Sequence, residues 1–154
     1  MKKLIMNLII GSLLILTSAC GQDTNLGSLN GSKDVEFNKD DYKKIISANN
    51  KLALDLLPNL ESNEQGNIFI SPTSLFMALS MVYNGADAKT KEEMAKVLNS
   101  EEIDIAELNK ANASLLSKLH NESEDIDLKV GNSIWLNEKF HFQDEFAQNN
   151  RDYY

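Results

Sequence analysis

The side chains that most often carry catalysis or bind metals are few and scattered in this 154-residue chain. His120 and His141 are the only histidines, and neither belongs to an HExxH or similar pair on one helix. A zinc site needs at least three convergent ligands, so none is expected. Serines are frequent, but no Gly-x-Ser-x-Gly turn and no set of Ser, His and Asp is visible as a nucleophile with its base. We therefore expect no enzyme activity, no metal and no cofactor.

The chain opens with a segment that is typical of export. Two lysines precede an apolar run over residues 4–16, and small side chains follow at residues 17–19. This order predicts a signal peptide over residues 1–19. The run is interrupted by polar residues and falls short of the roughly 20 apolar residues that cross a bilayer as a helix. Export is therefore expected, and a permanent membrane-spanning helix is not.

Cys20 is the only cysteine, so it can form no internal disulfide. It ends the stretch Leu-Thr-Ser-Ala-Cys, which resembles a bacterial lipobox, although Thr17 departs from the leucine most usual three places before the cysteine. The resemblance implies a lipid on Cys20 and a place on the outer face of the membrane. The alternative is an ordinary secretory peptide and a released protein. Within residues 20–39 the positions after the cysteine are rich in Gly, Ser, Asn and Asp, a composition typical of a flexible tether.

The charge of the chain limits its partners. The formal net charge is −8, and removal of residues 1–19 leaves 13 basic against 23 acidic side chains, a net charge of −10. Nucleic acid is excluded as an expected partner because its phosphates demand a basic surface. An acidic protein is also not attracted to anionic lipid, so membrane residence depends on the lipid anchor.

Residues 67–83 predict a short strand that leads into a buried helix. Residues 67–70 are an apolar run of strand type, and Ser71 and Pro72 then suit the cap and the first position of a helix. Ser74 is a polar residue of the first turn. Nearly every side chain over residues 75–83 is apolar, so we expect this helix to be covered on all sides.

Two amphipathic helices are expected on either side of this unit. Residues 40–57 carry apolar side chains at helical spacing and are stopped by Pro58, with Asn49 on or beside the inner face. Thr90 and Glu93 have the spacing of a capping box that starts a helix over residues 90–98.

Two further helices and a strand complete the prediction. One helix starts near Asp104, and a last one starts at about Gln143 and carries Phe146 inward. Between them, residues 126–136 alternate apolar and polar side chains as one long strand does. No other segment offers a comparable strand to pair with it, so its backbone edges would stay open. We therefore expect an incomplete domain.

The order of these motifs resembles the N-terminal part of the serpins, the serine protease inhibitors. The stretch NIFISPTSLFMALSMVYNGADAKTKEEMAKVL over residues 67–98 is similar to the helix B region of that family. Gly85 closes this helix, and Thr90 opens the next. The stretch VGNSIWL, which contains Asn132, resembles a family strand, and Phe146 and Tyr154 match an aromatic pair near helix E.

The resemblance implies an α+β serpin fold, of which residues 40–154 form roughly the first third, without the reactive loop. It places Ser71, Pro72 and Ser74 at the shutter, where the central sheet parts to admit that loop. For the whole protein it implies suicide inhibition of a serine or cysteine protease outside the cytoplasm, through loop insertion. The chain alone is then expected to be inactive. Two alternatives stay open at this point: a non-inhibitory serpin-like binding lipoprotein at the cell surface, and a truncated gene product without function.

Overall fold

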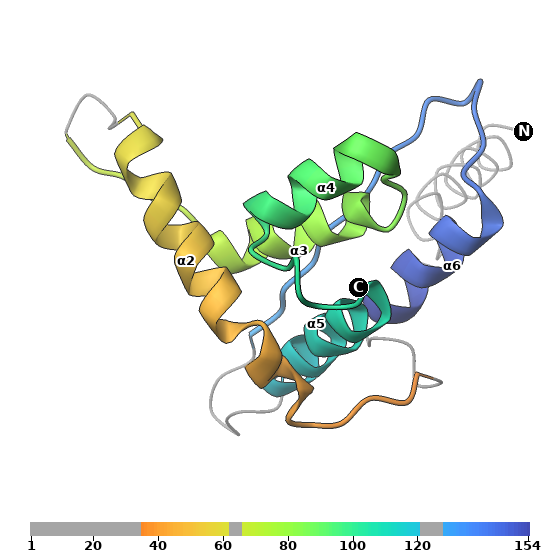
Figure 1. Ribbon diagram of the computed structural model, residues 1–154, viewed down its shortest axis with the longest axis horizontal. Coiled ribbons are helices and arrows are strands. Elements are labelled where there is room, and N and C mark those ends of the chain that lie inside the picture. The colour runs from red at the N-terminus through yellow and green to blue at the C-terminus, as the bar shows by residue number, and fades with distance from the viewer. Residues whose placement is uncertain (1–34, 62–65, 121–127) are drawn as a thin grey trace, which may run out of the picture.

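The computed structural model describes residues 35–61, 66–120 and 128–154 (Figure 1). The signal peptide, Cys20 and most of the tether lie outside these residues, so those predictions stay untested. The helices are η1 (Asp41–Lys44), α2 (Ile46–Leu56), η2 (Leu57–Asn59), α3 (Pro72–Tyr83), α4 (Ala88–Val97), α5 (Ile105–His120) and α6 (Asp144–Tyr153). None of the helices in the described ranges is long and apolar enough to cross a membrane.

Helix α3 lies at the centre of the arrangement. In Figure 1, α4 runs along α3, α5 lies below both, and α2 and α6 stand on opposite sides. Helix α3 contacts α2, α4 and α5, and α5 also contacts η1 and α6. Helix α3 therefore has neighbours that come from before and after it in the sequence.

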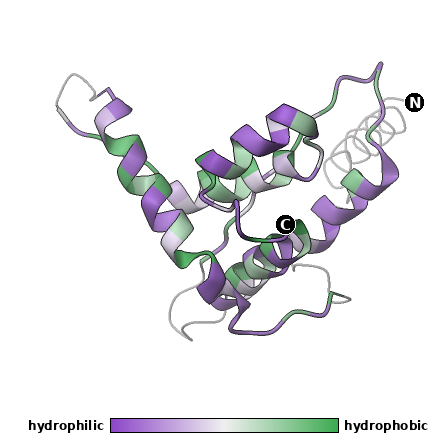
Figure 2. Cartoon of the chain, in the orientation of Figure 1, coloured by the Kyte–Doolittle hydropathy of each residue, from purple (hydrophilic) through white to green (hydrophobic). Residues whose placement is uncertain are grey.

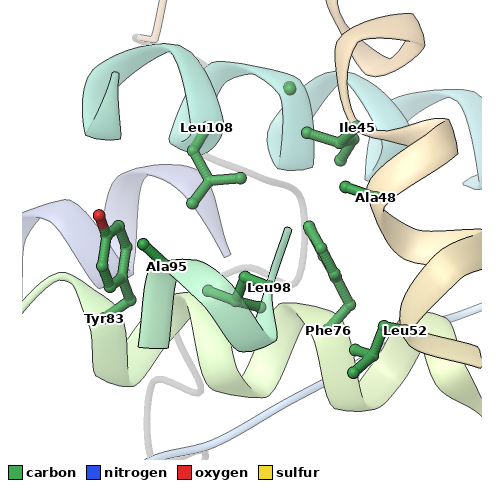
Figure 3. Packing of buried hydrophobic residues seen from close by; sticks show 9 residues of the cluster. Ile45, Ala48, Leu52, Phe76, Tyr83, Ala95, Leu98 and Leu108 are labelled. Atoms are coloured by element: carbon green, nitrogen blue, oxygen red, sulfur yellow. The ribbon is translucent and has the colours of Figure 1, made fainter. Parts of the chain in front are cut away.

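The hydrophobic core fills the space between α2, α3, α4 and α5. Figure 3 shows Phe76 pointing from α3 toward the side chains of Ile45 and Ala48, with Leu98 and Leu108 beside it. Phe76, Ile45, Leu98 and Leu108 have no exposed surface. Burial of a side chain of this size contributes about 1.5–3 kcal/mol, so this cluster is the main stabilising contact among the helices.

The segment predicted as one helix over residues 40–57 is divided into three pieces. The first turn is the 3-10 helix η1, because the Tyr42 N–H donates to the Oγ of Ser114 on α5 at 3.2 Å, and the same Oγ donates to the Lys39 carbonyl at 3.0 Å. These two bonds fix the turn against α5. Helix α2 then ends at Leu56, and Pro58 lies within the short 3-10 helix η2. Figure 2 shows hydrophobic and hydrophilic positions alternating along α2, as expected for an amphipathic helix.

Thr90 does not cap a helix, so the predicted capping box is wrong. Helix α4 begins two residues earlier, at Ala88, and the Asp87 carboxylate accepts a hydrogen bond from the Ala88 N–H at 2.7 Å. At the other end, Asn99 has a φ of 50°, and the Ser100 N–H donates to the Ala95 carbonyl at 2.9 Å. This is a Schellman ending, in which one left-handed residue satisfies the last carbonyls.

The later helices follow the sequence prediction. Helix α5 begins at Ile105, and the Asp104 carboxylate accepts from the Ala106 N–H at 2.9 Å. Helix α6 begins at Asp144 and carries two acidic residues in its first turn, which suits the positive end of the helix dipole.

The predicted strands are not formed among the described residues. Residues 128–136 and 67–70 have no strand assignment, and residues 126–127 lie outside the described ranges. A strand needs a hydrogen-bonded neighbour, and in the described part of the chain no segment lies in position to pair with residues 128–136. The alternation is nevertheless present, because Val130, Asn132 and Ile134 are half-buried while Gly131, Ser133 and Trp135 are exposed. Of the predicted α+β fold, the described residues therefore show the helices and no strand.

The largely apolar helix α3 is buried on one side only. Phe76, Met77 and Met81 are buried, whereas Leu75 and Val82, seven positions apart, are exposed. Other large apolar side chains are also exposed, most of all Phe69 at 99% and Trp135 at 90%. The expectation of covering layers on all sides is therefore not met within these residues.

Candidate functional site around helix α3

The start of α3 is built from short hydroxyl side chains. Ser71 is the N-cap and accepts from the Ser74 N–H at 3.4 Å, and Pro72 is the first helical residue. The Ser71 hydroxyl also donates to the Ser74 Oγ at 2.9 Å. The expected cap is present because Ser71 has an extended backbone (φ −120°, ψ 91°), which directs its oxygen toward the first free N–H groups.

Asn49 of α2 joins this end of α3. Its Nδ2 donates to the Oγ1 of Thr73 at 3.2 Å, and the Asn49 side chain is buried. The sequence placed Asn49 on the inner face of its helix but did not identify Thr73 as a partner. The only sequence signal that Thr73 could accept this bond is its position in the first turn of the helix, directly after Ser71 and Pro72. This α3 start cluster (Asn49, Ser71, Thr73 and Ser74) contains no titratable group, so it can donate and accept hydrogen bonds but not act in acid-base chemistry.

At the other end of α3, Gly85 is in close contact with Phe146. An ideal Cβ placed on Gly85 would lie 2.8 Å from Cδ2 and 2.9 Å from Cε2 of the Phe146 ring. The Phe146 ring also packs on Phe142, with centroids 5.0 Å apart. Gly85 and Phe146 were both identified from the family resemblance, and the structure shows that the two residues are in contact.

Tyr154 lies at the centre of a partly buried network of amide side chains, of which Asn109 and Asn112 are buried. Its hydroxyl donates to Asn109 Oδ1 at 2.7 Å and accepts from Asn112 Nδ2 at 3.1 Å. Asn109 Nδ2 donates to Asn84 Oδ1 at 2.8 Å, and Asn84 Nδ2 donates to Asn150 Oδ1 at 3.2 Å. We call Asn84, Asn109, Asn112, Asn150 and Tyr154 the asparagine-tyrosine network.

The hydrogen bonds of this network form one continuous chain, in which each side chain accepts from the residue before it and donates to the next. It ends where Asn150 Nδ2 donates to the Phe146 carbonyl at 2.9 Å. Such a chain polarises its own members, which strengthens each bond where water is partly excluded. The network connects the end of α3 with α5, with Asn150 on α6 and with Tyr154, the residue that follows α6. Burial raises the pKa of the Tyr154 phenol, and the hydrogen bond from Asn112 opposes that rise. Tyr154 is therefore neutral at physiological pH.

The asparagines of the network were missed by sequence reasoning. Asn109 and Asn112 lie three positions apart on α5, beside the apolar residues Leu108 and Ala111, and all four are buried. An amide on an apolar helix stripe was the available signal, because buried polar groups need partners. Those partners could not be read from α5, because they are 25 and 42 positions away.

The other selected residues lie apart from these two clusters. Thr90 is exposed on α4, at the rim of a hollow of about 420 Å³ that is also lined by Leu79 and Met94. Asn132 is half-buried in the extended segment. His120 ends α5 and His141 precedes α6, and the described residues contain no group of three or more side chains suited to hold a metal ion. Cys20 lies outside the described residues.

The chain is similar to known serpins over most of its length. The family model described as serpin (serine protease inhibitor) matches residues 47–154. A serpin-like protein of Methanosarcina acetivorans is 29% identical over 153 residues, which cover 96% of this chain and 34% of that protein. Serpin A12 of Mus musculus is 36% identical over 109 residues, covering 70% of this chain and 26% of that protein.

The leukocyte elastase inhibitor of Bos taurus is 33% identical over 113 residues, covering 73% of this chain and 29% of that protein. No solved structure matches the chain significantly. The chain thus spans between about a quarter and a third of the curated relatives named here. Because the family model covers well over half of the chain, this chain belongs to the serpin family.

Proposed function

We propose that this chain forms the N-terminal third of a serine-type endopeptidase inhibitor that acts outside the cytoplasm. The observation that carries the proposal is the serpin match over residues 47–154, together with the similarity to the bovine leukocyte elastase inhibitor. In the proposed mechanism, the target peptidase cleaves an exposed loop and forms an acyl-enzyme. The loop then inserts into the central sheet as a new strand before hydrolysis is complete.

The exposed apolar side chains support the idea that more polypeptide covers this part of the fold. Val82 and Leu75 on α3, and Trp135 on the extended segment, are large apolar groups open to solvent. Large exposed apolar side chains in this number are typical of surfaces that other protein segments cover. Residues 128–136 form no strand within the described residues, and in this proposal neighbouring strands of the central sheet pair with them.

In this proposal the α3 start cluster contributes to the shutter. Ser71 and Ser74 bond to each other in the described structure, and Ser71 is exposed. Each hydroxyl can exchange that bond for one to a strand of the central sheet. The cluster would thereby influence how readily the sheet opens. The reactive loop is not among residues 40–154, so the chain alone is inactive against peptidases.

A chimeric inhibitor tests the proposal. Residues 40–154 would replace the matching part of the bovine leukocyte elastase inhibitor, and the chimera would be mixed with leukocyte elastase. We expect a covalent complex that survives SDS electrophoresis, whereas the 154-residue chain alone gives none. A folded chimera that elastase cleaves without any stable complex would contradict the proposed inhibitory role and favour a non-inhibitory binding protein.

The proposal also includes a lipid anchor. A lipid on Cys20 would hold the domain on the outer face of the membrane through the tether of residues 21–39. The lipobox-like stretch of residues 16–20 and the absence of any second cysteine support this assignment.

A further inference from the structure

The end of α3 contains a chemically labile pair of residues, Asn84-Gly85. Glycine has no side chain to hinder its backbone nitrogen, so that nitrogen can attack the Cγ of a preceding asparagine. A bond then forms between Gly85 N and Asn84 Cγ, the Cγ–Nδ2 bond breaks, and ammonia leaves with the proton from Gly85 N. Water opens the resulting cyclic imide at either carbonyl and leaves aspartate or isoaspartate at position 84.

The packing around α6 requires both members of this pair. A side chain at position 85 would collide with the Phe146 ring, because even a Cβ would lie 2.8 Å from it. Position 84 needs both an acceptor and a donor, because Asn84 accepts from Asn109 and donates to Asn150. Among the common side chains of this length only asparagine carries both groups. The contact with α6 therefore demands a labile dipeptide.

The last turn of α3 and the side-chain network together hold the pair in an unreactive geometry. The Gly85 N–H donates to the Val82 carbonyl at 3.0 Å, so the attacking nitrogen is engaged. Asn84 has helical angles, φ −57° and ψ −27°, and must rotate about ψ before the five-membered imide can close. The bond from the Gly85 N–H to the Val82 carbonyl opposes that rotation, because turning ψ of Asn84 moves the Gly85 nitrogen, and the bond from the Asn84 N–H to the Ser80 carbonyl at 3.2 Å holds the start of the pair on the helix. The Asn84 amide is held at both its oxygen and its nitrogen.

We propose that Asn84 is a deamidation site whose reactivity is controlled by the docking of α6. While α6 is docked, the asparagine-tyrosine network and the Phe146 contact suppress the reaction. When α6 leaves, Asn84 and Gly85 gain the freedom to cyclise. The product is an aspartate or isoaspartate whose carboxylate has no hydrogen to donate. Asn150 Oδ1, which accepts from the Asn84 amide, would then face a second acceptor. Deamidation therefore prevents α6 from docking again in the same way.

The chain provides its own chemical reference for the test. Asn30-Gly31 is a second Asn-Gly pair, and in concentrated urea both pairs belong to an unfolded chain. The 154-residue protein would be incubated at mildly alkaline pH with and without urea, and aspartate and isoaspartate at both positions followed by peptide mass spectrometry. We expect similar rates at Asn84 and Asn30 in urea. In the native protein Asn84 should react at least about tenfold more slowly than in urea, the factor given by a local opening free energy of ~1.4 kcal/mol.

Variants of α6 separate docking from other effects. Asn150→Ala should raise the native rate at Asn84 toward the rate in urea, because it removes the acceptor of the Asn84 amide. Gln148→Ala is the matched control on the exposed side of α6 and should leave the rate unchanged. If Asn150→Ala unfolds the whole chain by circular dichroism, Tyr154→Phe replaces it, because the ring is kept and only the network is broken. Equal Asn84 rates in buffer and in urea, or a folded α6 variant with an unchanged rate, would overturn the proposal.

Discussion

The Phe146 ring of α6 lies directly against the Gly85 backbone, so close that a Cβ on Gly85 would be 2.8 Å from the ring. The backbone of Gly85 is not in the left-handed region, so this contact alone explains the glycine. Together with the bond from Asn84 to Asn150, it fixes α6 to the end of α3. The position of α6 therefore depends on a packing contact and a polar network that share adjacent residues.

Replacement of Gly85 by alanine tests the packing contact. The added methyl group must displace the Phe146 ring, so Gly85→Ala should lower the free energy of unfolding by about 1–3 kcal/mol, the usual cost of overpacking. Urea unfolding followed by circular dichroism measures it.

The double variant Gly85→Ala with Phe146→Leu is the control for this contact. A smaller side chain at position 146 leaves room for the methyl group, so the two effects should be less than additive. Strict additivity of the two substitutions would mean that residues 85 and 146 do not touch.

Tyr154→Phe tests the asparagine-tyrosine network at its centre. The substitution keeps the ring but leaves Asn109 Oδ1 without its donor, while Asn112 Nδ2 keeps its bond to the Leu108 carbonyl. An unsatisfied buried acceptor costs about 1–3 kcal/mol, so the free energy of unfolding at neutral pH should fall by that amount. A change within about 0.5 kcal/mol, as is usual for surface positions, would show that the network contributes little.

The same tyrosine gives a prediction about pH. Burial raises the pKa of the Tyr154 phenol above its ordinary value of 10.0. The stability that comes from keeping the phenol neutral is therefore fully present below about pH 10 and is lost as the pH rises above that value. The unfolding free energy should fall more steeply between pH 9 and about pH 11 in the wild type than in Tyr154→Phe.

Two other groups with raised pKa values do not confuse the comparison. The pKa of Tyr83 is raised by burial and by Asp104, and the pKa of Lys44 is raised by its hydrogen bond to Glu107. Both groups are present in the wild type and in Tyr154→Phe, so the difference between the two proteins reports on Tyr154. Parallel pH profiles would contradict the assigned burial of this side chain.

Much of the helical framework could be predicted because the signals were local. The Ser71-Pro72 start of α3, the Asp104 start of α5 and the start of α6 each depend on residues within one turn of the helix. The asparagine-tyrosine network could not be predicted, because its bonds join residues up to 66 positions apart. The long strand was predicted from alternation alone, but a strand also needs a partner that the described residues do not supply.

The start of α4 shows how two local signals compete. Both Asp87 and Thr90 are good N-cap residues, and the sequence favoured Thr90 because Glu93 completes a capping box. The structure uses Asp87, which bonds to the Ala88 N–H, and Thr90 and Glu93 then lie inside the helix. Local preference alone does not decide between two caps three residues apart.

A pair of matched substitutions checks that result. Asp87→Ala should reduce the free energy of unfolding by about 1 kcal/mol, because it removes the oxygen that accepts at the helix start. Thr90→Ala should change it by less than about 0.5 kcal/mol, because Thr90 is exposed and alanine is the better helix former. The reverse order of effects in urea unfolding would restore Thr90 as the cap.

Cys20→Ala tests the proposed anchor in a bacterial host that processes lipoproteins. If Cys20 carries a lipid, the mature wild-type protein should partition into the detergent phase, since two or more acyl chains bury many methylene groups at about 0.8 kcal/mol each. The alanine variant has no site for the lipid, and its acidic domain has no electrostatic attraction to anionic membranes, so it should move to the aqueous phase. Ser28→Ala in the tether is the control and should partition like the wild type. If Cys20→Ala also stays in the detergent phase, the lipid assignment is wrong and another feature of the chain holds it there.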